Sequence, residues 1–142
     1  MARQKIRAVA LDLEGTLIDL EGGNVPGEGH FGCFIKAALD CGYTLTFEQI
    51  TAHSNYIIGG GDQLVAAAVA ELCGGRVGQA HILELKQRYF EQYLHSHPAV
   101  LRPGAIEVIE RLRDMEMPIG IGSLTATKRA ECLIKATCLD YI

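Results

Sequence analysis

The sequence contains no tryptophan, only four prolines and no excess of positive charge. Its 13 basic and 17 acidic side chains give a formal net charge of −4 without long runs of one sign, which argues against nucleic acid or an anionic membrane as a main partner. A short basic start at residues 3–7 precedes an apolar run that is too short for a signal peptide or a membrane-spanning helix. The sequence therefore favours a cytoplasmic protein.

Metal-binding patterns are missing as well. The five cysteines are an odd number without C-x-x-C spacing, and the five histidines form no zinc signature. His95 and His97 lie at the polar end of a predicted helix, where exposure to solvent explains them better than a bound metal does. We expect the cysteines, most of which lie in helix-like apolar patterns, to be reduced and to serve as small buried apolar residues.

What the chain does contain is an apolar fraction of 49% over 142 residues, which is enough for a globular core. Helical periodicity fills the region between two segments interpreted as hinges, residues 19–29 and 98–104. No strand pattern separates the helices, so we expect an inserted all-helical unit. The predicted helices cover residues 30–41, 46–53, 62–72 and 79–96, with a Thr46–Gln49 capping box starting the second, Asp62 capping the third and Lys86 on the polar side of the fourth.

The first predicted strand, residues 5–13, leads into two carboxylates, a glycine and a hydroxyl. An apolar run bounded by a glycine is typical of a parallel sheet, in which ligands bind at the carboxyl ends of the strands. Asp12 is placed to meet such a ligand. Gly15 permits a sharp turn, and the Thr16 hydroxyl can hold the Asp12 carboxylate in one rotamer. A strand followed by an acidic turn without function is the alternative.

A second strand with a similar ending follows much later in the chain. Residues 105–115 form a predicted amphipathic helix with Ile106, Ile109 and Leu112 in register, and residues 118–123 then form a strand that ends in a hydroxyl. Thr125 is a predicted N-cap of the next helix, whose N-terminus would favour an anion near Ser123. Taken alone, Ser123 is explained as well by a helix cap, and Lys128 by a position on the helix surface.

The segment Asp12–Asp19 resembles the first motif of the haloacid dehalogenase (HAD) superfamily, Asp-x-Asp-Gly-Thr-Leu-x-Asp, and Ser123 is similar to its second motif. The sequence departs from the first motif at Glu14, where the motif has Asp, although enolase-phosphatase members of the superfamily also carry Glu at this position. The resemblance is to the helical-cap subclass, which includes phosphoglycolate phosphatases and β-phosphoglucomutases. It implies an α/β fold: a partial HAD-type Rossmann-like parallel sheet from residues 1–19 and 99–142, with residues 20–98 as an inserted all-helical cap domain.

The resemblance also implies roles for individual residues. Asp12 would be the nucleophile, Glu14 the general acid and base, Thr16 the residue that orients Asp12, and Ser123 the residue that holds phosphoryl oxygens. The substrate would be a small phosphorylated metabolite, and dehalogenase or phosphonatase chemistry fits less well because a carboxylate at position 14 suits an alkoxide leaving group. The predicted substrate-binding residues are Gly15, Leu124, Gly60 and Gly61. The last two belong to a run of glycines, for which a simple turn without function is the alternative.

Magnesium is the cofactor that the resemblance implies, held by the Asp12 carboxylate and the backbone carbonyl of Glu14. The lysine and the second acidic motif of the family have no counterpart before Ile142, so we expect a half-site to bind Mg²⁺ weakly. The alternative function is therefore a catalytically inactive, truncated remnant or an interaction module. Two strands alone would leave their outer edges unpaired, which predicts self-association or pairing with a missing C-terminal half.

Overall fold

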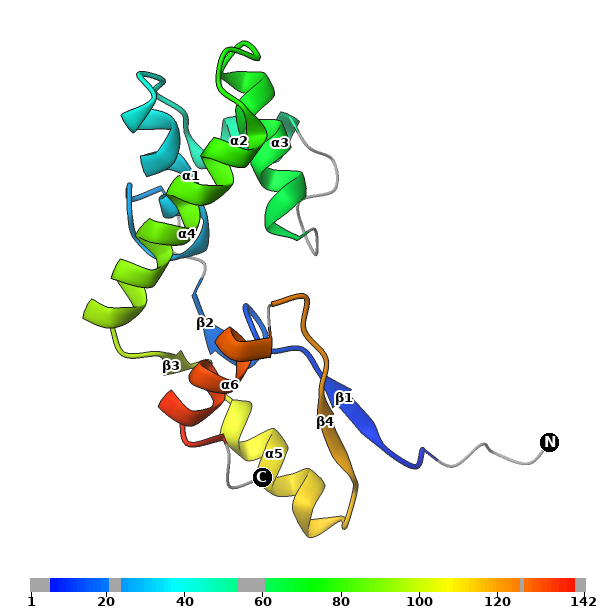
Figure 1. The fold of residues 1–142 in the computed structure, drawn as a ribbon. Helices are drawn as coiled ribbons and strands as arrows, with labels where there is room; N and C mark the ends of the chain where they lie inside the picture. The colour runs from blue at the N-terminus through cyan, green and yellow to red at the C-terminus, as the bar shows by residue number, and fades with distance from the viewer. Residues whose placement is uncertain (1–5, 21–23, 54–60, 126, 140–142) are drawn as a thin grey trace, which may run out of the picture. The chain divides into compact units, whose positions relative to one another are not determined.

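The chain folds into two compact units in a computed structural model that describes residues 6–20, 24–53, 61–125 and 127–139. Residues 1–20 and 99–142 form the first, here called the core unit, and residues 21–98 form the second, the helical unit (Figure 1). Within the described residues, no helix is both long and apolar enough to cross a membrane.

The core unit contains a parallel pair of strands, β1 (Val9–Leu11) and β4 (Ile119–Ile121), which lie side by side in Figure 1. Leu11 is opposite Ile121, and hydrogen bonds of 2.9 Å join Val9 N to Pro118 O and Gly122 N to Leu11 O. The predicted α/β fold with neighbouring parallel strands is confirmed. β1 is shorter than predicted, because its partner strand begins only after Pro118.

A second, antiparallel pair was not predicted. β2 (Ile18–Asp19) pairs with β3 (Val100–Leu101), so the segments that lead into and out of the helical unit run beside each other. Arg102 extends the pairing, since its N–H donates to Leu17 O at 2.9 Å and its guanidinium lies 3.6 Å from the Asp19 carboxylate. The regions interpreted as hinges therefore include a short two-stranded ladder.

Two helices of the core unit, α5 (Ala105–Asp114) and α6 (Thr127–Ala136), contribute to one cavity with β1 and β4. Ala105 and Ile109 are buried in α5, whereas Ile106, predicted to face the core, is 42% exposed. α6 begins at Thr127, one residue later than a Thr125 cap would place it. The cavity has a volume of about 290 Å³ and is lined only by aliphatic side chains: Leu11, Leu17, Ile109, Ile119, Ile121, Ile134 and Leu139.

In its described residues, 24–53 and 61–98, the helical unit forms four helices, whose predicted bounds agree with the structure to within about a residue. The capping box is present, because Gln49 N donates to Thr46 Oγ1 at 3.2 Å and Thr46 N donates to Gln49 Oε1 at 2.8 Å. Buried apolar side chains from all four helices, among them Phe34, Ile50 and Ile82, form one core. The helices are α1 (Gly29–Asp40), α2 (Phe47–His53), α3 (Asp62–Leu72) and α4 (Gln79–Ser96).

The cysteines are only partly as predicted. Cys33 and Cys73 are buried and Cys41 is partly buried, and none of the five forms a disulfide. Cys132 and Cys138 are exposed, contrary to the expectation of small buried apolar residues. They lie on and after α6, a short amphipathic helix that buries only Leu133.

Candidate active site

Asp12 and Thr16 are joined by a hydrogen bond directly after β1. The chain reverses tightly here: Leu17 N and Ile18 N both donate to Leu13 O, and Gly15 has a φ of +78°, a left-handed conformation that suits glycine. The reversal brings the Thr16 hydroxyl to Asp12, where it donates to Oδ2 at 2.9 Å. The Asp12 side chain is exposed at the carboxyl end of the strand. A fixed, accessible carboxylate is the arrangement that an attacking oxygen requires.

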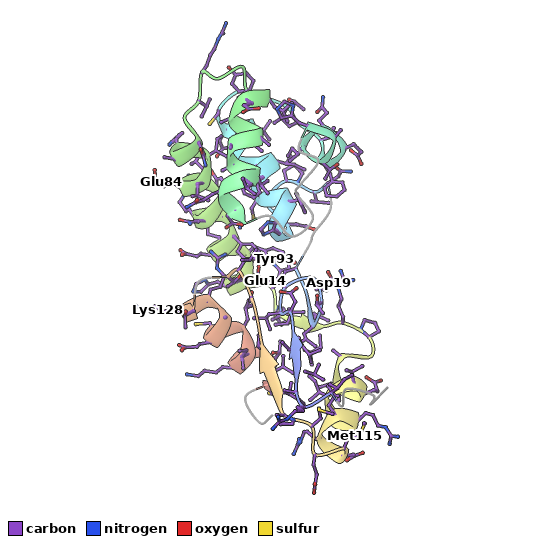
Figure 2. All side chains as sticks on the ribbon, turned by 90° about the vertical axis from the view of Figure 1, so that its right-hand side faces the viewer. Glu14, Asp19, Glu84, Tyr93, Met115 and Lys128 are labelled. Atoms are coloured by element: carbon purple, nitrogen blue, oxygen red, sulfur yellow. The ribbon has the colours of Figure 1, made fainter. Side chains whose placement is uncertain are left out.

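Glu14 lies in the same turn, in the segment that follows β1 (Figure 2). Its Oε1 is buried and makes no hydrogen bond within the described part of the chain. A desolvated carboxyl oxygen without a partner is unusual, because burial of an unpaired polar atom costs free energy. Glu14 is therefore a candidate for a catalytic group.

Ser123 is brought to the same edge of the strand pair as Asp12. Because Leu11 is opposite Ile121, the residues that follow β1 and β4 leave the two strands side by side. The Ser123 hydroxyl accepts a hydrogen bond from Thr125 N at 3.2 Å, so part of its role is to shape the turn before α6. Leu124 is 78% exposed in that turn, and Lys128 is exposed on α6 (Figure 2).

The two predicted glycines belong to the helical unit. Gly61 is the N-cap residue of α3, with extended backbone angles and no side chain to cap the helix. Gly60 lies outside the described residues. The structure thus groups Asp12, Glu14, Gly15, Thr16, Ser123 and Leu124 in the core unit, and it does not place Gly61 relative to them.

The helical unit also contains a polar cluster that the sequence did not predict. Lys86, predicted on the polar side of α4, is completely buried, and its ammonium contacts Asp62 and His30. Asp62 does not cap α3 through its side chain and instead pairs with Lys86. The signal was in the spacing, because Lys86 lies four residues from both Ile82 and Phe90 and so shares their buried side of the helix.

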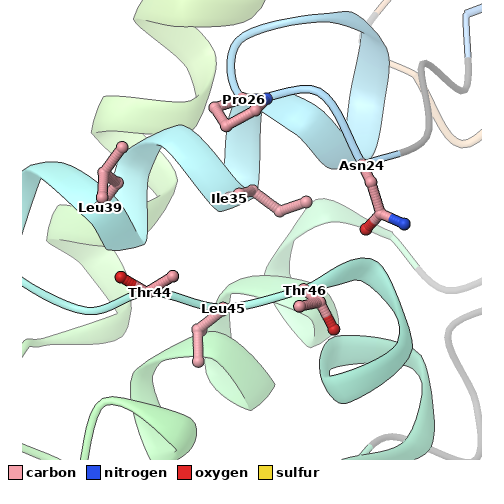
Figure 3. A pocket seen from close by; sticks show the side chains of 7 residues that line it. All are labelled: Asn24, Pro26, Ile35, Leu39, Thr44, Leu45 and Thr46. Carbon is pink, nitrogen blue, oxygen red and sulfur yellow. The ribbon is translucent and has the colours of Figure 1, made fainter.

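A cavity of about 250 Å³ also lies in the helical unit, beside α1 (Figure 3). None of its lining side chains is an acid or a base: they are Asn24, Pro26, Ile35, Leu39, Thr44, Leu45 and Thr46. Asn24 is engaged at the start of α2, where its Oδ1 accepts from Phe47 N at 2.7 Å and its Nδ2 donates to Glu48 at 3.0 Å. This cavity offers no catalytic group.

The oxygen ligands of the core unit suit a magnesium ion that is bound mainly through its substrate. Within the residues described, no group of three or more His, Cys, Asp or Glu side chains could hold a metal. Asp12 supplies an exposed carboxylate, and Glu14 adds a backbone carbonyl two residues later. Mg²⁺ commonly takes one or two carboxylates and completes its shell with phosphate and water. The residues present therefore fit such a shared site.

Comparison with known proteins identifies the fold. The sequence model of the haloacid dehalogenase-like hydrolases matches residues 6–141. No curated protein matches the sequence significantly. A predicted phosphoglycolate phosphatase from Haemophilus somnus 129PT is similar in structure with a TM-score of 0.68, 16% identity, and coverage of 99% of this chain and 61% of that protein.

Two further structures show the same fold. A mutant of CbbY from Rhodobacter sphaeroides, in complex with xylulose-(1,5)bisphosphate, has a TM-score of 0.66 and 18% identity over 94% of this chain and 58% of its own. A HAD family hydrolase from Deinococcus radiodurans R1, with bound phosphate and sodium, has a TM-score of 0.62 and 22% identity over 96% of this chain and 54% of its own. The chain thus spans between half and two thirds of the length of these proteins.

Proposed function

Because the chain belongs to the haloacid dehalogenase-like hydrolase family, we propose that it hydrolyses the phosphomonoester of a small metabolite through an aspartyl-phosphate on Asp12. The observation that carries this proposal is the hydrogen bond from Thr16 to Asp12 Oδ2 at the carboxyl end of β1. It fixes one carboxylate oxygen and leaves Oδ1 as the oxygen that we assign to the attack. In-line attack depends on this kind of positioning.

The first half-reaction transfers the phosphoryl group to the enzyme. Asp12 Oδ1 forms a bond to phosphorus while the bond from phosphorus to the ester oxygen breaks, and that oxygen receives a proton from Glu14. Within the described residues, Oε1 of Glu14 has no hydrogen-bond partner, so no other contact competes for this oxygen. Ser123, at the neighbouring strand end, would donate a hydrogen bond to a phosphoryl oxygen, and Leu124 and Gly15 would border the same group.

The second half-reaction releases phosphate. Glu14, now a carboxylate, accepts a proton from water as the water oxygen bonds to phosphorus, and the bond to Asp12 breaks to restore its carboxylate. When bound by Asp12 and the Glu14 carbonyl, magnesium would offset negative charge on the phosphoryl group.

A panel of phosphate esters tests the proposal. An aryl phosphate, phosphoglycolate and xylulose 1,5-bisphosphate, the last two suggested by the compared proteins, are incubated with the chain in the presence and absence of Mg²⁺. We expect magnesium-dependent phosphate release by the wild type and none by Asp12→Asn, in which the nucleophile is lost but the shape is kept. Equal, negligible turnover of both proteins would refute the proposal.

The second candidate function is that of a non-catalytic binding module. Such a module would bind phosphate esters without turnover. Binding of phosphoglycolate in calorimetry by both wild type and Asp12→Asn, without phosphate release, is the result that would identify it.

A further inference from the structure

The core unit contains a cavity with buried aliphatic walls. It has a volume of about 290 Å³, and the side chains that border it come from β1, β4, α5 and α6, from the turn after β1 and from the residues after α6. Three of them, Leu17, Ile109 and Leu139, are each only 3% exposed. The fold itself therefore builds the walls of this cavity, which distinguishes it from a flat apolar face.

The chemistry of the lining favours an apolar occupant. A buried water needs two to four polar partners, and the described side chains that border the cavity offer none. A segment of another chain would bring backbone N–H and C=O groups against side chains that cannot pair with them. An apolar molecule meets no such cost, and its transfer from water to aliphatic surroundings is favourable.

The volume of the cavity limits the size of that occupant. An apolar cavity of about 150 Å³ accepts one benzene molecule, whereas pockets for drug-sized ligands begin at about 300 Å³. A volume of about 290 Å³ therefore suits a single aromatic ring or a short alkyl chain. Ile121 borders the cavity and is 37% exposed, so a ligand can enter from solvent at the end of β4.

We propose that this cavity binds one small apolar molecule, a single aromatic ring or a short alkyl chain, and that the bound molecule stabilises the turn that holds Asp12. Leu11 directly precedes Asp12 and Leu17 directly follows Thr16, so the cavity borders both ends of that turn. The N–H of Leu17 donates to Leu13 O at 3.0 Å, and a ligand against the Leu17 side chain opposes opening of this hydrogen bond. A ligand that binds only the folded state adds to its stability.

Methyl NMR of the isoleucines, with benzene as the probe, tests the site. We expect the δ1-methyl signals of the isoleucines that border the cavity to shift saturably, with a dissociation constant on the order of 1 mM. Ile50 and Ile82, which lie in the buried core of the helical unit, should not shift. Shifts that do not saturate, or equal shifts in both units, would refute the site. The isoleucines that border the cavity are Ile109, Ile119, Ile121 and Ile134.

Ile109→Phe fills the cavity from α5 and tests where benzene binds. The larger side chain takes the space of the ligand, so we expect the affinity for benzene to fall by about tenfold or more. The matched control is Ile106→Phe, the same change on the same helix at a side chain that is 42% exposed, and it should bind benzene as the wild type does. Ile134→Phe fills the cavity from α6 and replaces Ile109→Phe if that variant does not fold. Undiminished affinity in a folded filled variant would overturn the assignment.

Amide hydrogen exchange tests the effect of the ligand on the turn. At saturating benzene we expect slower exchange at Leu17 and Ile18, whose N–H groups donate to Leu13 O, and unchanged exchange in α1 of the helical unit. Unchanged exchange at Leu17 would refute the stabilisation of the turn. Isoleucine shifts that follow protein concentration and not benzene would assign the cavity to a second copy of the chain and overturn the apolar ligand. None of these measurements involves phosphatase activity, so each result holds whether or not the chain is a hydrolase.

Discussion

The direction of the Asp12 carboxylate is set by a single hydroxyl. Thr16 reaches it because the turn after β1 closes on Leu13 and passes through a left-handed Gly15. The sequence alone predicted this pair, since the glycine between them permits a turn sharp enough to bring the hydroxyl of Thr16 back to the carboxylate of Asp12. What the sequence did not predict is the burial of Glu14 Oε1, which depends on how the turn packs.

Thr16→Val tests the orientation of the nucleophile. The valine keeps the shape of threonine and removes the donor to Asp12 Oδ2, so the carboxylate would sample other rotamers. We expect kcat for phosphate release to fall by about tenfold, the scale of a modest misplacement of a reacting group. Thr44→Val, an exposed threonine in the helical unit, serves as the control. An unchanged kcat in Thr16→Val would show that Thr16 does not orient Asp12.

Gly32 is required by a close approach between backbones. A Cβ built on Gly32 of α1 would lie 2.0 Å from the carbonyl oxygen of Val25, a separation that no real contact allows. The neighbouring segment would have to shift in Gly32→Ala, and we expect the free energy of unfolding in urea to fall by about 1–3 kcal/mol, as in other overpacked sites. Gly120→Ala, where a Cβ would meet nothing within 4 Å, should stay within about 0.5 kcal/mol of the wild type.

On the scale of whole elements, α1 and α4 are joined on their exposed side by a carboxylate. Asp40, the last residue of α1, accepts hydrogen bonds from Lys36 and from the Tyr89 hydroxyl of α4. The hydrogen bonds from Lys36 and Tyr89 hold the pKa of Asp40 below its ordinary value of 3.8. A group with a lowered folded-state pKa stabilises the fold above its unfolded-state pKa and loses that contribution as the pH falls.

The stability of the wild type relative to Asp40→Asn should therefore depend on pH in a defined window. We expect the difference in free energy of unfolding to be constant at neutral pH and to shrink as the pH falls below about 4. Urea unfolding of both proteins at a series of pH values measures it. A difference that grows toward acid pH would contradict the lowered pKa.

The accuracy of the helix predictions follows from how local their causes are. The bounds of α4 and the capping box of α2 depend on residues within a few positions of each other, so periodicity and capping rules suffice. The β2–β3 pair was missed because each strand has two residues and its partner lies far along the chain. Lys86 was misplaced for a related reason: its spacing from Ile82 and Phe90 puts it on the buried side of α4, but the partners that allow a lysine to be buried there, Asp62 and His30, lie on two other helices.

On the scale of the whole molecule, the residues of β1 and β4 in the core unit are exposed or only partly buried. As far as the residues are described, β1 and β4 each pair on one side only, and a parallel sheet of two strands is unusual because such sheets are normally buried. The aliphatic cavity beside them is bordered by Ile121, which is 37% exposed. Exposed edges beside apolar surface favour pairing with another chain.

We therefore expect the purified chain to self-associate, and sedimentation velocity would detect this. Ile121→Lys places a charge at the edge of β4 and should shift the population toward monomer. Leu64→Lys, a comparable change at an exposed leucine of the helical unit, should not. A clean monomer for the wild type at micromolar concentration would contradict association. Loss of self-association on adding a polypeptide that can pair with these strands would show that the open strand edges mediate the association.

The β2–β3 ladder marks the place at which the helical unit could be removed from the chain. Asp19 and Val100 are opposite each other in antiparallel register, so the whole of residues 20–99 occupies the place of a hairpin turn. A two-residue Asn-Gly loop has the geometry to join two such positions. We therefore expect that the helical unit can be excised or exchanged at this pair of strands without altering β1 and β4, the strands that Asp12 and Ser123 follow.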